Sequence, residues 1–303
     1  MEKRIIPSSE LIVNQDGSIF HLHLKPEQLA DKIILCGDPD RVGMIANYFD
    51  SRECDVQNRE FRTITGSYKG KRITVQSHGI GGDNIEIVAS ELDALANFDL
   101  EKRCVRDEFR QLTMVRIGTS GGLQPESPIG SYVASEKAIG FDGVIYFYGE
   151  TEKVRDLAYE KALTQQLDWK IEGLKPYVVS ADAELLERIV GNDGRIIKGS
   201  TIACNGFYAP QGRKLRLPLA DENLNKKIED FRYEGYKITN FEMESSALSA
   251  MASLLGHKAM TVCCIIAGRQ NLNMNTDYKG SIEDLIRIVL EHLSSVQGHL
   301  PET

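Results

Sequence analysis

The sequence predicts an α/β fold, because short apolar runs alternate with longer amphipathic stretches along the chain. The apolar runs are bounded by glycine and proline, which is typical of buried strands. The chain has 303 residues, of which 42% are hydrophobic, so it can form a large core. Its length fits about two domains, or one large α/β domain, equally well.

In the first half of the chain, the helix predicted near 41–49 carries Val42, Ile45 and Phe49 on one face. Residues 1–19 show no periodicity, and we interpret them as an N-terminal extension. The other elements predicted here are strands near 32–36, 60–65, 72–77, 112–117 and 131–134, and a helix of about 85–97.

The second half of the chain begins with residues 150–192, which are rich in Lys, Glu, Gln and Leu, and we expect helical insertions there. The alternation of strand and helix then resumes. The elements predicted in this half are helices at Glu152–Leu167, 183–190, Glu244–Leu255 and 281–294, and strands at 195–203, 236–241 and 258–266.

The chain is acidic, with a net charge of -8 and a pI of about 5.4, which argues against nucleic-acid binding. An anion site must therefore be built from local positive charge. The charged start, Met1-Glu2-Lys3-Arg4, does not fit a signal peptide, and no run of about 20 apolar residues exists to span a membrane. None of the cysteines forms a CxxC pair or a zinc spacing, so we expect a reduced, cytoplasmic protein without a metal.

Two arginines each lie beside the C-terminal end of a predicted buried strand, in what we interpret as a tight polar turn. Arg41 follows Gly37-Asp38-Pro39-Asp40, and Arg116 precedes Ile117-Gly118-Thr119. Ligands of open α/β sheets bind outside the carboxyl ends of strands. Two guanidinium groups there, with glycine amides and a threonine hydroxyl, suit a small anion such as phosphate. Either arginine alone would more simply be a surface ion-pair partner.

Two further segments permit more than one interpretation. Gly79-Ile80-Gly81-Gly82 lacks the last glycine of a dinucleotide fingerprint, because Asn84 stands there, so we favour a tight strand-to-helix turn, although such a turn could still face a ligand. Glu242 and Glu244 lie where a strand meets a helix. A helix dipole would stabilise either carboxylate, but a carboxylate also accepts hydrogen bonds from vicinal hydroxyls.

The loop from Asn205 to Arg213 places an aromatic ring, an amide and a guanidinium close together. Gln211 and Arg213 can read the edge of a heterocycle that has adjacent carbonyl and N–H groups, and Phe207 can stack on its face. Loops commonly carry such residues, so the pattern alone is only suggestive. His21 has no suitably spaced metal-binding partner and fits a surface histidine.

Taken together, these segments resemble the nucleoside phosphorylase family, and within it the enzymes that act on uridine. The matching pieces run in family order from about residue 20 to 295. They are Phe20-His21-Leu22, Gly37-Asp38-Pro39-Asp40-Arg41-Val42, Arg59-Glu60-Phe61, Gly79-Ile80-Gly81-Gly82, Arg116-Ile117-Gly118-Thr119-Ser120-Gly121, Phe207-Tyr208 with Gln211 and Arg213, Phe241-Glu242-Met243-Glu244, and Arg269.

The resemblance implies a single three-layer α/β/α domain with a central mixed, partly barrel-like sheet flanked by helices. That domain would span 20–298, with a helical insertion near 150–182. It also implies which residues hold each part of the substrates. Phosphate would be bound by Gly37, Arg41, Arg59, Arg116 and Thr119, ribose by His21, Met243 and Glu244, and the base by Phe207, Gln211, Arg213 and Arg269.

The implied reaction is phosphorolysis of uridine to uracil and ribose 1-phosphate, in pyrimidine salvage. Arg116, Gln211 and Arg213 would be catalytic, with phosphate as a co-substrate and no other cofactor. Family members that bind a monovalent cation pair a glutamate matching Glu60 with a serine, and Asn84 replaces that serine here, so the resemblance does not support a monovalent cation in this protein. His21 and Arg59 would be supplied by a neighbouring subunit of a homo-oligomer, either a dimer or a hexamer built as a trimer of dimers.

Three alternatives remain open on the same fold. A purine nucleoside phosphorylase would place an aspartate after the strand at 258–266, yet Cys263 to Asn275 contains no acidic residue. A nucleosidase, which uses water, would not need Arg41, Arg59 and Arg116 together. A non-catalytic nucleoside-binding protein would not need to keep both the phosphate arginines and the loop from Asn205 to Arg213, which we call the base loop.

Overall fold

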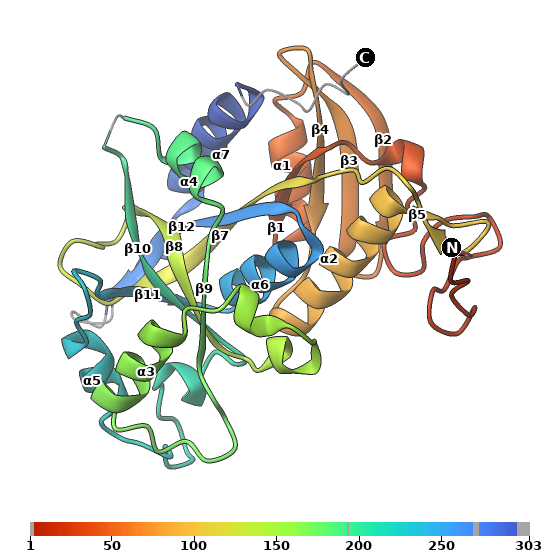
Figure 1. The fold of residues 1–303 in the computed structure, drawn as a ribbon. Helices are drawn as coiled ribbons and strands as arrows, with labels where there is room; N and C mark the ends of the chain where they lie inside the picture. Colours follow the sequence, from red (N-terminus) through yellow and green to blue (C-terminus); the bar gives the residue numbers. More distant parts are fainter. Residues whose placement is uncertain (1–2, 193, 269–272, 296–303) are drawn as a thin grey trace.

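The computed structural model describes residues 3–192, 194–268 and 273–295, and it confirms the predicted α/β class (Figure 1). Its main sheet has eleven strands among these residues. They are β1 (Lys32–Cys36), β2 (Ser51–Asn58), β3 (Phe61–Tyr68), β4 (Lys71–Ser77), β7 (Thr113–Gly122), β8 (Tyr132–Phe141), β9 (Tyr177–Ser180), β10 (Ile196–Cys204), β11 (Ile238–Glu242), β12 (Lys258–Gly268) and β13 (Asn273–Met274). A separate hairpin consists of β5 (Phe98–Asp99) and β6 (Cys104–Val105).

The sheet is mixed and partly closed. Strand β12 pairs with β8 and with β7, so that β12, β8, β10, β11 and β7 form a ring. Strands β1, β4, β3 and β2 continue from β7 as an open extension. This arrangement confirms the expected barrel-like sheet, and it places the ends of β1, β7, β11 and β12 around one region.

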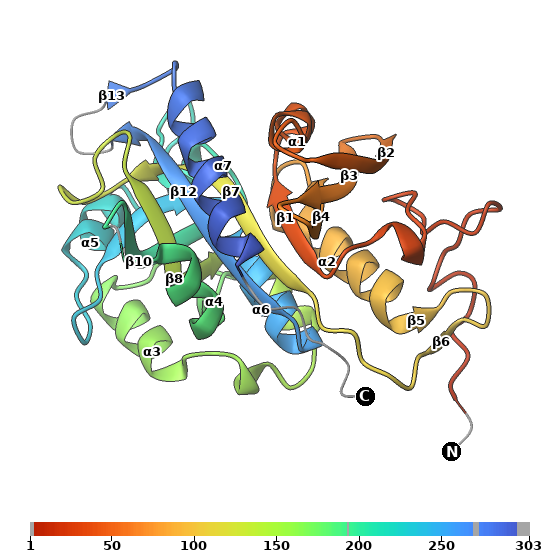
Figure 2. The same cartoon turned by 90° about the horizontal axis from the view of Figure 1, so that it is seen from above.

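Helices cover both faces of the sheet, as Figures 1 and 2 show for α1 and α2 on opposite sides of β1 and β4. They are α1 (Pro39–Ala46), α2 (Gly82–Asn97), α3 (Leu157–Gln166), α4 (Ala183–Val190), α5 (Leu224–Asp230), α6 (Ser245–Leu255) and α7 (Lys279–Ser294). Strand β1 illustrates how the sequence produces the layers, because alternate side chains of a strand point to opposite faces. Ile34 and Cys36 pack with α1, α4 and α7, whereas Ile33 and Leu35 pack with α2 and α6.

Most predicted elements are present, with small differences at their ends. The helix expected at Glu152–Leu167 is shorter, because Asp156 accepts a hydrogen bond from the backbone of Tyr159 and so begins α3. Six of the strands and helices named above were not predicted, namely β2, β5, β6, β9, β13 and α5. Strand β2 is exposed or half-buried throughout, so it lacks an apolar pattern. None of the described helices is both long and apolar enough to cross a membrane.

The turn expected after Arg116 is wrong, because β7 continues to Gly122. Residues 117–122 pair with β12, and two of them also pair with β11. Glycines make this close packing possible rather than ending the strand. A Cβ atom on Gly122 would lie 2.1 Å from the backbone oxygen of Ser127, and one on Gly118 would lie 2.7 Å from Nη1 of Arg116.

A substitution at Gly140 would show how tightly the ring of strands packs against β9. A Cβ atom there would lie 2.2 Å from the ring of Tyr177, which is fully buried. We expect Gly140→Ala to lower the free energy of unfolding by about 1–3 kcal/mol, because the aromatic ring cannot move without disturbing the core. The control is Gly280→Ala, in an exposed part of α7 with nothing within 4 Å of the added methyl group. Urea unfolding should show no loss for this control, and equal losses in the two variants would contradict the packing described here.

Candidate active site

A cavity of about 890 Å³ opens where β1, β7, β11 and β12 come together. Most of the residues predicted for the site line it, although they come from distant parts of the chain. They are Gly37, Arg41, Arg116, Thr119, Phe207, Gln211, Arg213, Met243 and Glu244. Among the described residues no cluster of histidine, cysteine, aspartate and glutamate is arranged to hold a metal ion.

The end of β1 brings Gly37 and Arg41 to this cavity. Asp38 caps α1 by accepting a hydrogen bond of 2.9 Å from the backbone of Asp40, which sets Arg41 in the first turn of the helix. The Arg41 guanidinium is largely buried, and its Nη1 donates to the backbone oxygen of Ile117 at 3.3 Å. Residue 37 must be small, because a Cβ atom there would lie 3.0 Å from the backbone oxygen of Gly79.

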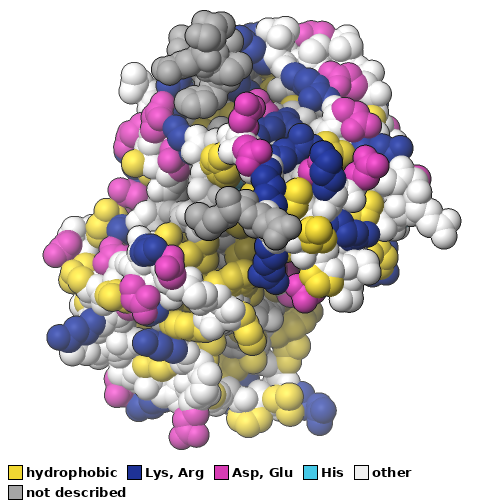
Figure 3. Space-filling model, turned by 45° about the vertical axis from the view of Figure 1, so that its right-hand side comes forward, with side chains coloured by type: hydrophobic (Ala, Val, Ile, Leu, Met, Phe, Trp, Pro, Cys, Tyr) yellow, Lys and Arg dark blue, Asp and Glu magenta, His cyan; other side chains and the backbone are white. Residues whose placement is uncertain are grey.

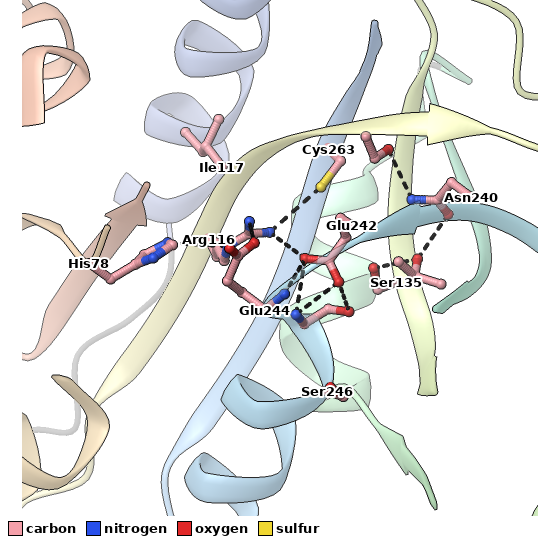
Figure 4. A network of polar contacts seen from close by, with 12 residues as sticks. His78, Arg116, Ile117, Ser135, Asn240, Glu242, Glu244, Ser246 and Cys263 are labelled. Carbon is pink, nitrogen blue, oxygen red and sulfur yellow. Dashed lines mark hydrogen bonds and ion pairs between the residues drawn. The ribbon is translucent and has the colours of Figure 1, made fainter. Parts of the chain in front are cut away.

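Arg116 lies at the centre of a buried network of polar contacts (Figure 4). Its side chain is only 4% exposed. Its Nε donates to Nε2 of His78 at 3.2 Å, and its Nη1 donates to Oε2 of Glu242 at 2.9 Å and to Sγ of Cys263 at 3.7 Å. Its Nη2 forms a short ion pair with Oε2 of Glu244. Arg116 is therefore already engaged at all three nitrogens.

These contacts keep Arg116 charged. Burial alone would lower the pKa of Arg116, but the charges of Glu244 and Glu242 outweigh it and raise that pKa. Burial raises the pKa of Glu244, and the positive charge of Arg116 opposes this rise. Burial also raises the pKa of Cys263 to about 12, so Cys263 contributes a neutral thiol.

Glu242 and Glu244 have different roles, which the sequence could not distinguish. Glu242, the last residue of β11, accepts hydrogen bonds from the backbone of Glu244 and from both the backbone and the hydroxyl of Ser245. It therefore stabilises the beginning of α6, as the helix-dipole interpretation expected. Oε1 of Glu244 instead accepts a hydrogen bond of 2.7 Å from the backbone of Gly81. The glycine turn between β4 and α2 therefore holds the carboxylate of Glu244 at the cavity, in addition to reversing the chain.

The base loop has a defined internal arrangement. The guanidinium of Arg213 lies 3.7 Å from the centre of the Phe207 ring and donates to Oε1 of Gln211 at 2.6 Å. Gln211 is buried, whereas Phe207 is 46% exposed. The predicted aromatic ring, amide and guanidinium therefore lie together, with the amide oxygen held by the guanidinium.

Among the predicted site residues that the structure describes, two, His21 and Arg59, do not line the cavity. His21 is half-buried, and its Nδ1 lies 2.6 Å from Oε1 of Glu91, so it is not a simple surface histidine. Arg59 is exposed in the turn between β2 and β3, where its φ is 54°. Arg269 lies outside the described residues. Asn84 stands where cation-binding members of the family would have a serine, and its Nδ2 donates to Oε1 of Glu60 at 3.4 Å.

Sequence reasoning missed His78 as part of this region. It is fully buried and contacts Arg116, yet nothing in its local pattern distinguishes it from a core residue. Its place directly between a predicted strand and the glycine turn was the available signal. On the face in Figure 3, basic and acidic side chains are interspersed. The basic side chains that line the cavity are three arginines, Arg41, Arg116 and Arg213.

Comparison with known proteins identifies the family of this chain. A family model described as the phosphorylase superfamily matches residues 31–293. The chain belongs to this superfamily. It is 29% identical over 264 residues to a uridine phosphorylase of Thermococcus kodakarensis, covering 86% of this chain and 82% of that protein. It is 28% identical to a DeoD-type purine nucleoside phosphorylase of Geobacillus stearothermophilus, covering 81% and 85% of the two chains.

A solved structure extends the likeness to three dimensions. The Trypanosoma brucei nucleoside phosphorylase, described as showing uridine phosphorylase activity, superposes with a TM-score of 0.84 at 27% identity. The match covers 95% of this chain and 100% of that one. The superfamily fold therefore accounts for the ring of strands, its open extension and the flanking helices.

Because Glu242 pairs with the buried guanidinium of Arg116, neutralising Glu242 should have a large effect on the free energy of unfolding. We expect Glu242→Gln to lower the free energy of unfolding by about 3 kcal/mol, because it removes one of the two carboxylates that compensate a buried guanidinium. The matched control is Glu184→Gln, whose carboxylate pairs with Lys258 on the surface and whose loss should change little. Urea unfolding of both variants measures the difference. Similar losses in the two variants would contradict the network described here.

Proposed function

We propose that this protein is a uridine phosphorylase that converts uridine and phosphate to uracil and ribose 1-phosphate. The observation that carries the proposal is that one cavity combines Arg41 and Arg116, suited to an anion, with the Gln211–Arg213 pair, suited to a pyrimidine edge. Glu244 lies in the same cavity and can accept hydrogen bonds from ribose hydroxyls. The uridine phosphorylases among the similar proteins support the same function.

In the proposed reaction the glycosidic bond stretches until the ribose resembles an oxocarbenium cation, and phosphate then attacks it. Gln211 and Arg213 stabilise the negative charge that develops on the departing uracil. Fixed hydrogen-bond donors of this kind contribute strongly to catalysis, and losing one typically costs about 10²–10³ in rate. No protein nucleophile is required.

The network around Arg116 adds a step to this reaction. Nη2 of Arg116 is paired with Oε2 of Glu244, and in the proposed reaction phosphate replaces this carboxylate as the partner of that nitrogen. Once released, Glu244 can accept hydrogen bonds from the ribose. Binding of phosphate thereby prepares the ribose contact, and the two substrates favour each other's binding.

The purine nucleoside phosphorylases among the similar proteins make purine nucleosides the second candidate substrate. The sequence argues against them, because Gly268 stands near the place where a purine-specific aspartate would be expected. The proposal further includes a role in pyrimidine salvage, a cytoplasmic location and no cofactor. The free cysteines support a reducing compartment.

We also propose a homo-oligomer in which each active site is completed by the neighbouring subunit. His21 and Arg59 match family residues that reach the neighbour's substrate, and neither is among the residues lining the cavity of its own chain. A two-fold dimer is the smallest assembly that allows this exchange, and a hexamer made of three such dimers would preserve it.

The first test of the proposed function is a cleavage assay on the purified protein. We expect uracil to form from uridine only when phosphate is present, with ribose 1-phosphate as the second product. Inosine is the control, and it should react far more slowly, because the base loop is matched to a pyrimidine edge. Cleavage of uridine without phosphate would indicate a nucleosidase, and equal turnover of inosine would reject the pyrimidine assignment.

The shared site makes a mixing prediction. Arg59→Ala and Glu244→Ala chains should each be inactive, but a mixed dimer contains one site with both lesions and one site with neither. We therefore expect activity to return when the two variants exchange subunits. Mixing Arg41→Ala with Glu244→Ala is the control, because both residues line their own chain's cavity and every site keeps a lesion. If confirmed exchange of the first pair restores nothing, Arg59 acts within its own chain.

A further inference from the structure

His78 contacts Arg116 from the side opposite to the carboxylates (Figure 4). It directly follows β4, and its backbone donates to the oxygen of Cys36 at 2.9 Å. Next to it, the backbone of Gly79 donates to the oxygen of Gly37 at 3.0 Å. These hydrogen bonds extend the pairing of β4 with β1 and hold the imidazole in a fully buried place behind the cavity wall.

The contact with Arg116 defines the protonation state of His78. Arginine nitrogens only donate hydrogen bonds, so Nε2 of His78 must be the acceptor in the 3.2 Å contact with Nε of Arg116. The ring is therefore neutral and carries its hydrogen on Nδ1. Burial, together with the positive charges of Arg116 and Arg41, lowers the pKa of His78 well below its ordinary value, so the ring stays neutral at physiological pH.

This acceptor determines how the Arg116 guanidinium is turned. With Nε held by His78 and Nη1 held by Glu242, Nη2 remains as the corner that contacts Glu244 at the cavity. Without an acceptor at Nε, only Glu242, Glu244 and Cys263 would hold the guanidinium. Charge-assisted pairs with carboxylates are strong, and closer pairing with both carboxylates would draw Nη2 away from an incoming anion.

We infer that His78 is a positioning residue for phosphate, the nucleophile. The neutral imidazole of His78 holds Nε of Arg116 and so keeps Nη2 of Arg116 directed to phosphate. This inference rests on the proposed function in one respect, namely that the anion bound by the cavity is phosphate. It assigns to His78 no contact with either substrate. Its removal should therefore weaken phosphate binding and leave nucleoside binding nearly unchanged.

The test compares His78→Leu, which has no acceptor, with His78→Gln, whose amide oxygen can replace Nε2. Isothermal titration calorimetry with inorganic phosphate alone measures binding without catalysis. We expect His78→Leu to weaken phosphate binding by about ten-fold or more, and His78→Gln to stay within about three-fold of the unmodified protein. Ser249→Ala is the control, because it removes a buried hydroxyl that has no partner among the described residues and should leave phosphate binding unchanged.

A merely structural role would give a different result. Unchanged phosphate affinity in a folded His78→Leu would overturn the inference alone, as would equal weakening of phosphate and uridine, measured as KM values, in both His78 variants. Absence of phosphate binding by the unmodified protein would overturn the proposed function together with the inference. These outcomes are therefore distinguishable.

A second measurement is made on the unmodified protein and uses His78→Gln only to assign the signal. Nitrogen-15 NMR of the histidine-labelled protein reports which ring nitrogen carries hydrogen, and the signal absent from His78→Gln identifies His78. We expect a neutral ring with hydrogen on Nδ1 and an acceptor shift at Nε2. A ring protonated at both nitrogens, or at Nε2 alone, at neutral pH would overturn the inference.

Discussion

The burial of one positive charge organises this active site. The guanidinium of Arg116 is almost completely removed from solvent. An unpaired charge in such a buried place would be very unfavourable. Its partners come from the end of β11, the beginning of α6, the end of β4 and strand β12. Satisfying a single side chain therefore requires that the ring of strands and its open extension be correctly assembled, which links the fold directly to the chemistry.

The same network explains how a buried ion pair can serve a reaction. Glu242 and Glu244 both pair with Arg116 and both line the cavity, but the side chain of Glu244 does not cap α6. Glu242 is committed to the backbone and hydroxyl at the beginning of the helix. In the proposed reaction, Glu242 and His78 are therefore permanent partners of Arg116, whereas Glu244 is the partner that phosphate displaces. A guanidinium with permanent partners on two sides and an exchangeable partner on the third is suited to binding an anion reversibly.

Much of the fold and of the site could be predicted from the sequence, for identifiable reasons. Helix α4 and strand β1 have clear apolar patterns, and the ordered motifs identified the cavity-lining residues from Gly37 to Glu244. The continuation of β7 was missed because glycine usually ends a strand, whereas here Gly118 and Gly122 allow close packing. The pairing of Arg116 with Glu244 could not be foreseen, because the two residues are 128 positions apart in the chain.

In the proposed reaction, phosphate replaces Glu244 at Nη2 of Arg116 while the other contacts of that arginine persist. A crystal structure of the phosphate complex would reveal this replacement in the distance between Nη2 of Arg116 and Oε2 of Glu244. We expect this ion pair to be broken, a phosphate oxygen to lie within hydrogen-bond distance of Nη2, and His78 and Glu242 to stay in contact with Arg116. Phosphate bound in the cavity with the Arg116–Glu244 pair intact would contradict it.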